Sequence, residues 1–198
     1  MIETRTAVFD PLDGKAPYRL GVLLVLFNAS GQIFAGERNA PAHEMPSWQL
    51  PQGGIKQYLS GGRVTGQEKE NEAALRELRE EAGDGIKAAI IAMAAKPCRL
   101  DFTAGGNDKY RGQILTPVLL RYLGGKIDLS RPEEGESKPA FRNYDWFHPH
   151  DFLHISPAFK QPIYQQALGN FSHIIGRITP SYPPSFRGSR DWPRREPL

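Results

Sequence analysis

The alternation of apolar and polar positions predicts a chain made mostly of β-strands, with two amphipathic helices. Apolar runs at residues 20–28 and 32–38 flank a short Ala-Ser-Gly segment, which is typical of a β-hairpin. Further strands are predicted at residues 86–93, 99–103, 114–122 and 144–148. One helix is predicted before Gly83 and another at residues 159–175, beginning near Pro162. This order favours an α/β fold in which helices cover both faces of a mixed sheet.

The first predicted helix has an apolar stripe that can pack on the sheet. The stripe consists of Ala74, Leu75, Leu78 and Ala82. Gly83 and the Asp-Gly pair after it are expected to end the helix, because glycine readily leaves helical geometry at a C-terminus.

Carboxylates gather on the other side of this helix, where we expect them to face outward. At 100° per residue, Glu70, Glu77 and Glu81 fall within about 40° of one another, and Glu80 lies about 60° further round. Like charges at this spacing repel by about 0.2 to 0.5 kcal/mol per pair. A hard divalent cation would relieve the repulsion, since carboxylate oxygens are its preferred ligands. The alternative is an ordinary solvated acidic surface.

The acidic stripe belongs to a longer pattern. From Gly62 through Glu68 and Arg76 to Gly83, the chain reads G-x5-E-x7-R-E-L-x-E-E-x-G. This pattern resembles the Nudix box of the Nudix hydrolase family, with Asp84 where the family usually has an aliphatic residue. The resemblance implies a Nudix-type α/β/α sandwich with a mixed β-sheet.

The resemblance also implies roles for the charged residues. It implies that Glu77, Glu80 and Glu81 bind Mg2+, with Mn2+ as an alternative, and that Glu77 also acts as a base toward water. Arg76 would orient one of these carboxylates. The implied reaction is the metal-dependent hydrolysis of a phosphoanhydride bond.

A second set of segments resembles one branch of the family, the branch of bacterial RNA 5'-pyrophosphohydrolases and dinucleoside polyphosphate hydrolases. These segments are Gly36-Glu37-Arg38, residues 47–55 with Pro51-Gln52-Gly53-Gly54, residues 110–113, residues 144–146, and Phe159-Lys160 followed by Tyr164. The resemblance covers about residues 18–175. It implies that the substrate is a nucleoside polyphosphate, either a dinucleoside polyphosphate or the 5' end of triphosphorylated RNA.

Three departures from the branch change these expectations. Nine extra residues separate Gly53 from Glu68, so we expect a longer mobile loop over residues 55–63, with Gly62 taking over the box position. Ala140 stands where the branch has a glutamate that serves as a further metal ligand or base, and the loop acids Glu133, Glu134 and Glu136 are candidate replacements. Residues 112–117 lack a second glutamine and an aromatic residue typical of RNA-directed members, which weakens the RNA assignment.

Substrate contacts are expected from cations, aromatic rings and the Pro-Gln-Gly-Gly segment. The candidate phosphate-binding cations are Arg38, Lys109, Arg111 and Lys160. The candidates for stacking on a base are Trp48, Tyr110 and Phe141. Gly62 or Gly53 is expected to let the backbone approach the phosphates closely, because glycine leaves room for it. Gln52 and Gly54 are further candidate substrate-binding residues. Surface charge or core packing is the alternative role for each cation and ring.

Composition limits the class of protein. The 198 residues, 39% of them hydrophobic, suit one domain at residues 18–178, with an extension at 1–17 and a Pro- and Arg-rich tail at 179–198. No apolar run approaches the roughly 20 residues of a membrane span, and no signal-peptide pattern opens the chain. The single Cys98 fits a reducing compartment, so we expect a cytoplasmic protein without a membrane partner. The tail, with its arginines and aromatics, suits either nucleic-acid contact or a plain surface extension.

Two other functions stay open on the sequence alone. One is hydrolysis of another nucleoside diphosphate linked to a second group, such as ADP-ribose. The other is a Nudix-like module that binds nucleotides or RNA without turnover, which Ala140 and the inserted segment favour and the intact acidic pattern disfavours.

Overall fold

The computed structural model describes residues 2–39, 47–102, 109–132 and 138–179. Its centre is a mixed sheet built on β3 (Tyr18–Phe27), which pairs in parallel with β11 (Gly112–Gly125). The sheet continues through β10 (Cys98–Asp101) on one side and through β4 (Ile33–Arg38) and β12 (Phe141–Phe147) on the other. The shorter or outer strands are β2 (Val8–Phe9), β5 (Trp48–Gln49), β6 (Gln52–Gly54) and β9 (Ile86–Met93).

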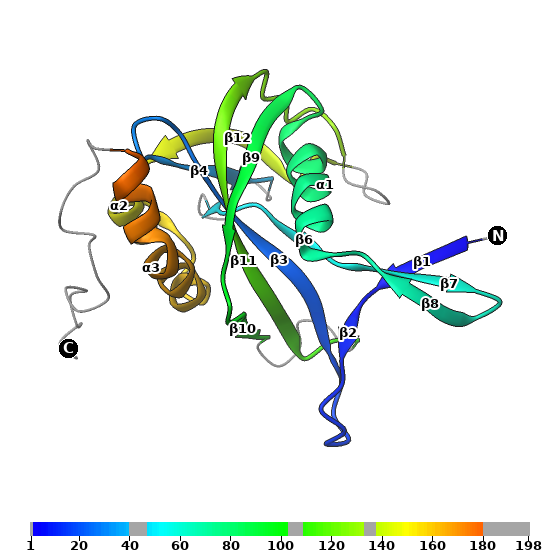
Figure 1. The fold of residues 1–198 in the computed structure, drawn as a ribbon. Helices are drawn as coiled ribbons and strands as arrows, with labels where there is room; N and C mark the ends of the chain where they lie inside the picture. The colour runs from blue at the N-terminus through cyan, green and yellow to red at the C-terminus, as the bar shows by residue number, and fades with distance from the viewer. Residues whose placement is uncertain (1, 40–46, 103–108, 133–137, 180–198) are drawn as a thin grey trace, which may run out of the picture.

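Helices cover both faces of this sheet, as Figure 1 shows. Helix α1 (Glu70–Ala82) lies on one face, and helices α2 (Pro149–Ile155) and α3 (Gln161–Ile178) lie on the other. Strand β3 is buried on both sides: Leu23, Val25 and Phe27 belong to the cluster with α2 and α3, whereas Val22, Leu24 and Leu26 belong to the cluster with α1. Alternate side chains of this one strand therefore pack in two hydrophobic cores, one on each face of the sheet. The predicted α/β/α sandwich is confirmed.

The long elements agree with the sequence predictions. The predicted strands all occur, and both predicted helices occur within a few residues of the expected bounds. Helix α2 and the short strands β5 and β6 were not predicted, because two to seven residues carry too little periodicity. None of the helices in the described residues is long and apolar enough to cross a membrane. Apart from Thr179, the predicted tail lies outside the described residues, as do the acids Glu133, Glu134 and Glu136.

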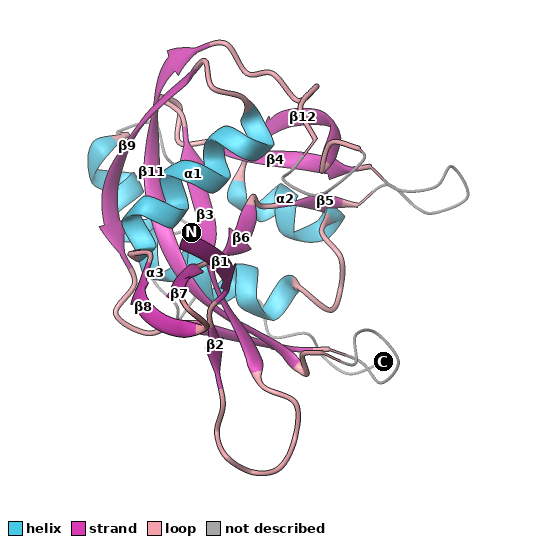
Figure 2. Cartoon of the chain, turned by 90° about the vertical axis from the view of Figure 1, so that its right-hand side faces the viewer, coloured by secondary structure: helices cyan, strands magenta, loops and turns pink. Residues whose placement is uncertain are grey.

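The inserted segment is a β-hairpin, so the prediction of a mobile loop is wrong. Strands β7 (Lys56–Ser60) and β8 (Arg63–Gln67) pair with each other, and β1 (Ile2–Thr6) adds a third strand along β7. Figure 1 shows that this three-stranded unit, which we call the arm, projects from the body of the protein, and Figure 2 views the arm nearly end-on. Its third strand comes from the start of the chain, which a local sequence pattern does not reveal.

Gly62 lies at the tip of the arm rather than at the Nudix box position. Gly61 and Gly62 have φ angles of 56° and 75°, and they join β7 to β8 in the two-residue turn that hairpins favour. A Cβ atom added at Gly62 would meet nothing within 4 Å. The expectation that Gly62 takes over the box position is therefore corrected.

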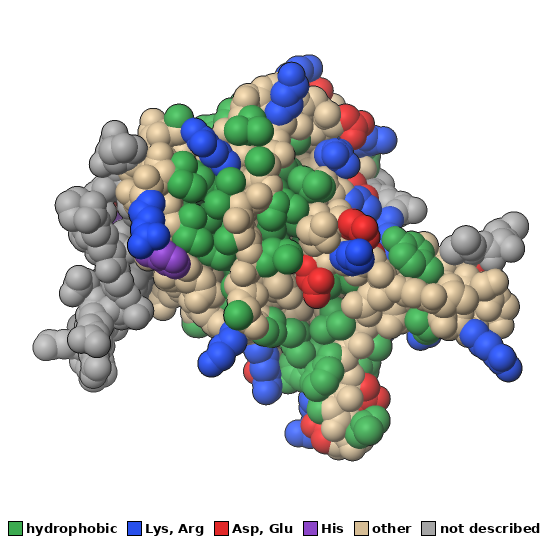
Figure 3. All heavy atoms as spheres, in the orientation of Figure 1, with side chains coloured by type: hydrophobic (Ala, Val, Ile, Leu, Met, Phe, Trp, Pro, Cys, Tyr) green, Lys and Arg blue, Asp and Glu red, His purple; other side chains and the backbone are tan. Residues whose placement is uncertain are grey.

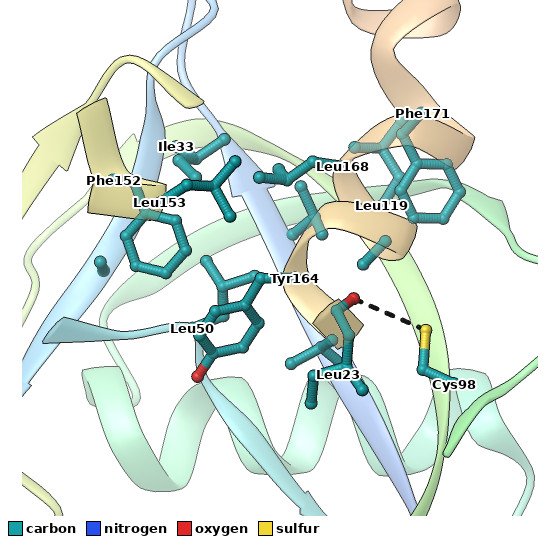
Figure 4. Packing of buried hydrophobic residues seen from close by; sticks show 14 of the residues in the cluster. Leu23, Ile33, Leu50, Cys98, Leu119, Phe152, Leu153, Tyr164, Leu168 and Phe171 are labelled. Carbon is teal, nitrogen blue, oxygen red and sulfur yellow. Dashed lines mark hydrogen bonds between the residues drawn. The ribbon is translucent and has the colours of Figure 1, made fainter. Parts of the chain in front are cut away.

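Tyr164 is the largest fully buried side chain in the core between the sheet and α3, and Figure 4 shows how it packs beside Leu50. Its hydroxyl lies near the backbone of Leu50 but makes no hydrogen bond of good geometry. Cys98 lies in the same core, where burial raises the pKa of its thiol to about 11 and the thiol contacts the carbonyl oxygen of Ile163 at 3.7 Å. The cysteine therefore acts as a small buried apolar residue, as expected.

We expect Tyr164→Phe to leave the free energy of unfolding unchanged within about 1 kcal/mol, because the hydroxyl contributes no well-formed hydrogen bond. Tyr164→Ala should lose about 3 to 5 kcal/mol by leaving a cavity. Chemical denaturation of the two variants measures both values. A loss of 2 kcal/mol or more in the phenylalanine variant would mean that the hydroxyl is hydrogen-bonded in solution.

Candidate active site

Helix α1 carries the acidic residues of the site and is fixed at both ends. At its start the backbone N–H of Lys69 donates to the Glu72 carboxylate at 3.2 Å, and at its end Gly83 leaves the helix with a φ of 91°. The helix packs on β3 and β6, which turns part of its acidic side inward. Glu77 and Glu81 are only 6% and 5% exposed, contrary to the expectation that the acids face outward.

Arg76 holds the acidic groups together. Its guanidinium donates to both carboxylate oxygens of Glu68, at 2.8 and 2.7 Å, and to the carbonyl oxygen of Gly54 at 2.7 Å. It also donates to Glu77 at 2.6 Å and to Glu80 at 3.1 Å. The Arg76 side chain therefore connects Glu68, which precedes the helix, with two acids of the helix and with strand β6.

This arrangement supplies part of the positive charge that the acidic stripe requires. Burial alone would raise the pKa of Glu68, but the hydrogen bonds from Arg76 and from the Lys56 backbone hold that pKa below its usual value. Burial alone would lower the pKa of Arg76, but its carboxylate partners Glu68 and Glu77 more than offset this effect and hold that pKa above its usual value. Three carboxylates, those of Glu68, Glu77 and Glu80, therefore share the positive charge of one guanidinium.

Gly53 gives Glu77 the room that it occupies. Strand β6 pairs with β3, with Gly53 opposite Val22, and this pairing places β6 against α1. A Cβ atom at Gly53 would lie 1.7 Å from the carboxyl carbon of Glu77. Any larger residue at position 53 would displace the glutamate. Gly53 is therefore the glycine that packs directly against the acidic residues.

A second network joins the acids to a buried lysine. The backbone N–H of Gln52 donates to Glu81 at 3.1 Å, and the Gln52 side chain donates to Gln113 at 2.9 Å. The amine of Lys160 donates to the amide oxygens of Gln49 and Gln52, at 2.6 and 2.9 Å. Burial and, to a smaller extent, the charge of Arg38 lower the pKa of Lys160 to about 8, against an opposing effect of Glu81.

These groups line one open cleft of about 580 Å3. The predicted site residues that line it are Arg38, Gln52, Gly53, Gly54, Arg76, Glu77, Glu80, Glu81 and Lys160, together with the stacking candidate Phe141. Glu77, Glu80 and Glu81 all come from α1, and we call these three acids the acidic wall, whereas Arg38 ends β4 and Lys160 immediately precedes α3. The cleft therefore offers both carboxylates and cationic side chains to a bound molecule.

Three predicted binding residues lie elsewhere, as does the stacking candidate Tyr110, which is buried. Trp48 packs edge-on against Phe147, with ring centroids 4.9 Å apart. Arg111 forms an ion pair with Asp13 at 2.7 Å, and Lys109 lies over the ring of Tyr110. The structure thus places Trp48, Arg111 and Lys109 in packing or surface contacts and does not bring them into the cleft. Ala140 is buried beside the cleft-lining Phe141.

Sequence reasoning missed other residues that line the cleft: Arg19, Gln49, Gln113 and Phe159. The guanidinium of Arg19 lies against Gly54, where an added Cβ would be 2.7 Å from one of its nitrogens. Arg19 could have been identified from the sequence, because it is the one charged residue in the otherwise largely apolar strand β3. The two glutamines carried no such signal, because their role depends on strand pairing.

The donor chemistry of the acidic wall fits a hard divalent cation. Glu77, Glu80 and Glu81 line the cleft and offer carboxylate oxygens, which are the donors that Mg2+ and Mn2+ prefer. Within the described residues, no three acidic, histidine or cysteine side chains already converge as a finished metal site. Arg76 engages Glu77 and Glu80 instead.

Comparisons with known proteins identify relatives of this chain. RNA pyrophosphohydrolase of Zymomonas mobilis is 35% identical over 161 residues, which cover 78% of this chain and 95% of that protein. RNA pyrophosphohydrolase of Cereibacter sphaeroides is 36% identical over 173 residues, covering 82% of this chain and 94% of that protein.

The fold has matching solved structures as well. One is described as a possible asymmetric diadenosine tetraphosphate hydrolase from Jonesia denitrificans, and it matches with a TM-score of 0.54 and 15% identity over 80% of this chain and 95% of that chain. A Nudix hydrolase from Nitrosomonas europaea matches with a TM-score of 0.52 and 14% identity over 88% of this chain and 98% of that chain. Residues 17–167 match the NUDIX domain family. The chain therefore belongs to the Nudix family.

Proposed function

We propose that this protein is a metal-dependent Nudix pyrophosphohydrolase that cleaves a phosphoanhydride bond in a nucleoside polyphosphate, with the 5' end of triphosphorylated RNA as the leading substrate. The observation that carries the proposal is the cleft in which the acids Glu77, Glu80 and Glu81 share one space with Arg19, Arg38 and Lys160. A polyphosphate requires both kinds of residue, because its negative charge is balanced in part by basic side chains and in part by metal ions that carboxylates bind. Relatives that are 35% and 36% identical and are named RNA pyrophosphohydrolase favour the RNA substrate over dinucleoside polyphosphates.

The residues of the acidic wall would hold the metal and prepare the water. Glu77, Glu80 and Glu81 are the proposed ligands, and Mg2+ is the proposed ion, with Mn2+ as its substitute. Such an ion makes bound water acidic and stabilises charge on phosphoryl oxygens. Glu77 is the proposed base, and Arg76 positions it through their hydrogen bond of 2.6 Å. Arg76 acts through the carboxylates and the carbonyl of Gly54, so it is a positioning residue.

The basic residues would bind the phosphates that do not meet the metal. Lys160 is held by two amide oxygens rather than by a carboxylate, so its charge is available to an anion in the cleft. Phe141 and Phe159 line the same cleft and supply aromatic surface for the terminal base.

We expect Glu80→Gln and Glu81→Gln each to lower kcat by more than the roughly 10- to 100-fold that loss of an outer partner of a metal site costs. Release of pyrophosphate or phosphate from triphosphorylated RNA, with Mg2+ and after chelation, measures the effect. Glu72→Gln is the matched control, because Glu72 lies on the exposed side of the same helix and glutamine retains the oxygen that accepts from Lys69. Unchanged turnover in both site variants would end the metal assignment. Tight RNA binding with no product in either metal would favour the non-catalytic module.

We expect kcat/KM of the wild type to fall as pH rises above about 8, because Lys160 is protonated below that value and loses its charge above it. Lys160→Met should lower kcat/KM at pH 7 by about tenfold or more, as expected for a lost charge-assisted hydrogen bond, and should abolish this fall. Initial rates from pH 6.5 to 9.5 test both points. Lys87→Met, on the exposed part of β9, should keep the wild-type profile. A fall that persists in the Lys160 variant would assign the titration to another group.

Gly53→Ala and Gly62→Ala separate the two candidate box glycines. Gly53→Ala should reduce turnover by at least about 100-fold, because a 1 Å displacement of a reacting group has that cost and the new Cβ overlaps the Glu77 carboxyl group. Gly62→Ala should keep turnover and lose about 1 kcal/mol of stability from its left-handed backbone. Steady-state rates with thermal melts distinguish them. The reverse ranking of turnover would restore Gly62 to the site.

A further inference from the structure

The strand register divides the arm into two faces. Neighbouring side chains of a strand point to opposite sides, whereas directly paired residues share a side. One face carries Thr4, Thr6, Lys56, Tyr58, Ser60 and Arg63, and we call it the cleft face. The opposite face carries Glu3, Arg5, Gln57, Leu59 and Val64, and we call it the outer face.

The cleft face begins at the active-site cleft and leads away from it. Thr6 and Lys56 pair with each other at the base of the arm, and both line the cleft. Tyr58 follows two residues further along β7. Arg63 pairs with Ser60, four residues beyond Lys56, which corresponds to about 13 Å along the strand. The face is therefore a continuation of the cleft toward the tip of the arm.

The chemistry of this face suits a single-stranded nucleic acid. Such ligands are held by basic groups along the backbone and by aromatic rings on which bases stack. Tyr58 is half-buried, and Gly66 on the paired strand leaves the space beside its ring free of a side chain, since an added Cβ would lie 3.6 Å from the ring. Among the described residues, this face carries the cations Lys56 and Arg63 and no acid, whereas Arg5 and Glu3 lie on the outer face. Figure 3 shows Lys and Arg side chains along the lower edge of the arm.

We propose that the cleft face of the arm binds the single-stranded RNA that follows a 5'-triphosphate held in the cleft, with a base stacked on Tyr58 and a phosphate bound by Arg63. The proposal rests on the proposed function and extends it from the reacting end to the body of the substrate. A protein partner fits this face less well, because the face also carries Ser60 and Lys56, and serine and lysine are depleted at protein interfaces.

Two substrates with the same reacting end test the proposal. One is ATP, and the other is a 5'-triphosphorylated single-stranded RNA of about 12 nucleotides. The variants are Tyr58→Ala, Arg63→Ala and Tyr58→Phe, and Arg5→Ala is the matched control because it removes one positive charge from the outer face of the same arm. Thermal melts of all variants establish that the fold is intact.

The expected result is a change in KM that depends on RNA length. Tyr58→Ala should raise KM for the 12-nucleotide RNA about tenfold, the order expected for one lost stacking contact, and should leave ATP hydrolysis unchanged. Tyr58→Phe should stay near the wild type because it keeps the ring. Arg63→Ala should lower the slope of log KM against log salt concentration by about 0.7 for the RNA, as expected for one lost phosphate contact, whereas Arg5→Ala should keep the slope.

Other results would overturn the proposal. Equal effects of Tyr58→Ala on ATP and RNA would mean that the arm acts on the cleft itself, and no effect on either would exclude contact. A variant effect that accompanies a change of oligomeric state on size-exclusion chromatography would assign the face to a second copy of the chain.

A binding measurement separates this proposal from the proposed function. Fluorescence anisotropy with 3'-labelled, 5'-hydroxyl RNA needs no turnover, and weaker binding by Tyr58→Ala supports the arm contact even if the protein hydrolyses neither substrate. If Tyr58→Ala hydrolyses both substrates and binds RNA with unaltered affinity, the proposed function stands and the proposed RNA contact of the arm is wrong.

Discussion

The hydrogen-bonded contact between the Arg76 guanidinium, its carboxylate partners and the Gly54 carbonyl is the interaction on which the site depends. It ties α1 to β6 and to Glu68 ahead of the helix, so three segments share one fixed arrangement. Breaking one partner out of such a buried pair commonly costs about 3 to 5 kcal/mol, because the remaining charge stays buried and unpaired. The acids are therefore held close together by the protein itself, against a repulsion that would otherwise spread them.

The two sides of the cleft come from different parts of the fold. The acids come from one helix, whereas Arg19 and Arg38 come from β3 and β4, and Lys160 immediately precedes α3. Lys160 keeps its position because α3 packs on the sheet through Ile163, Tyr164 and Ala167. Packing in the core between α3 and the sheet thus fixes where Lys160 lies relative to the acids of α1.

Much of the fold could be predicted from the sequence because its signals are local. The period of α1 placed Glu77, Glu80 and Glu81 on one side, and the apolar runs marked β3, β4 and β11. The rest depends on contacts between distant segments. Counting residues favoured Gly62 as the box glycine, whereas the pairing of β6 with β3 brings Gly53 to Glu77. The same limit applies to Gln113, which reaches the site only because β11 lies beside β3.

The arm has a thermodynamic consequence for the rest of the protein. Among the arm residues whose burial the structure describes, Leu59 is the one buried apolar side chain, so backbone pairing supplies most of the stability of the arm. Its strands can separate without exposing either hydrophobic core, which makes the arm a unit of local unfolding with its own, lower free energy of opening. Amide hydrogens in β1 and β8 would then exchange with solvent faster than those in β3. A ligand that bridges the arm and the body would slow that exchange, and part of its binding energy would be used to hold these strands together.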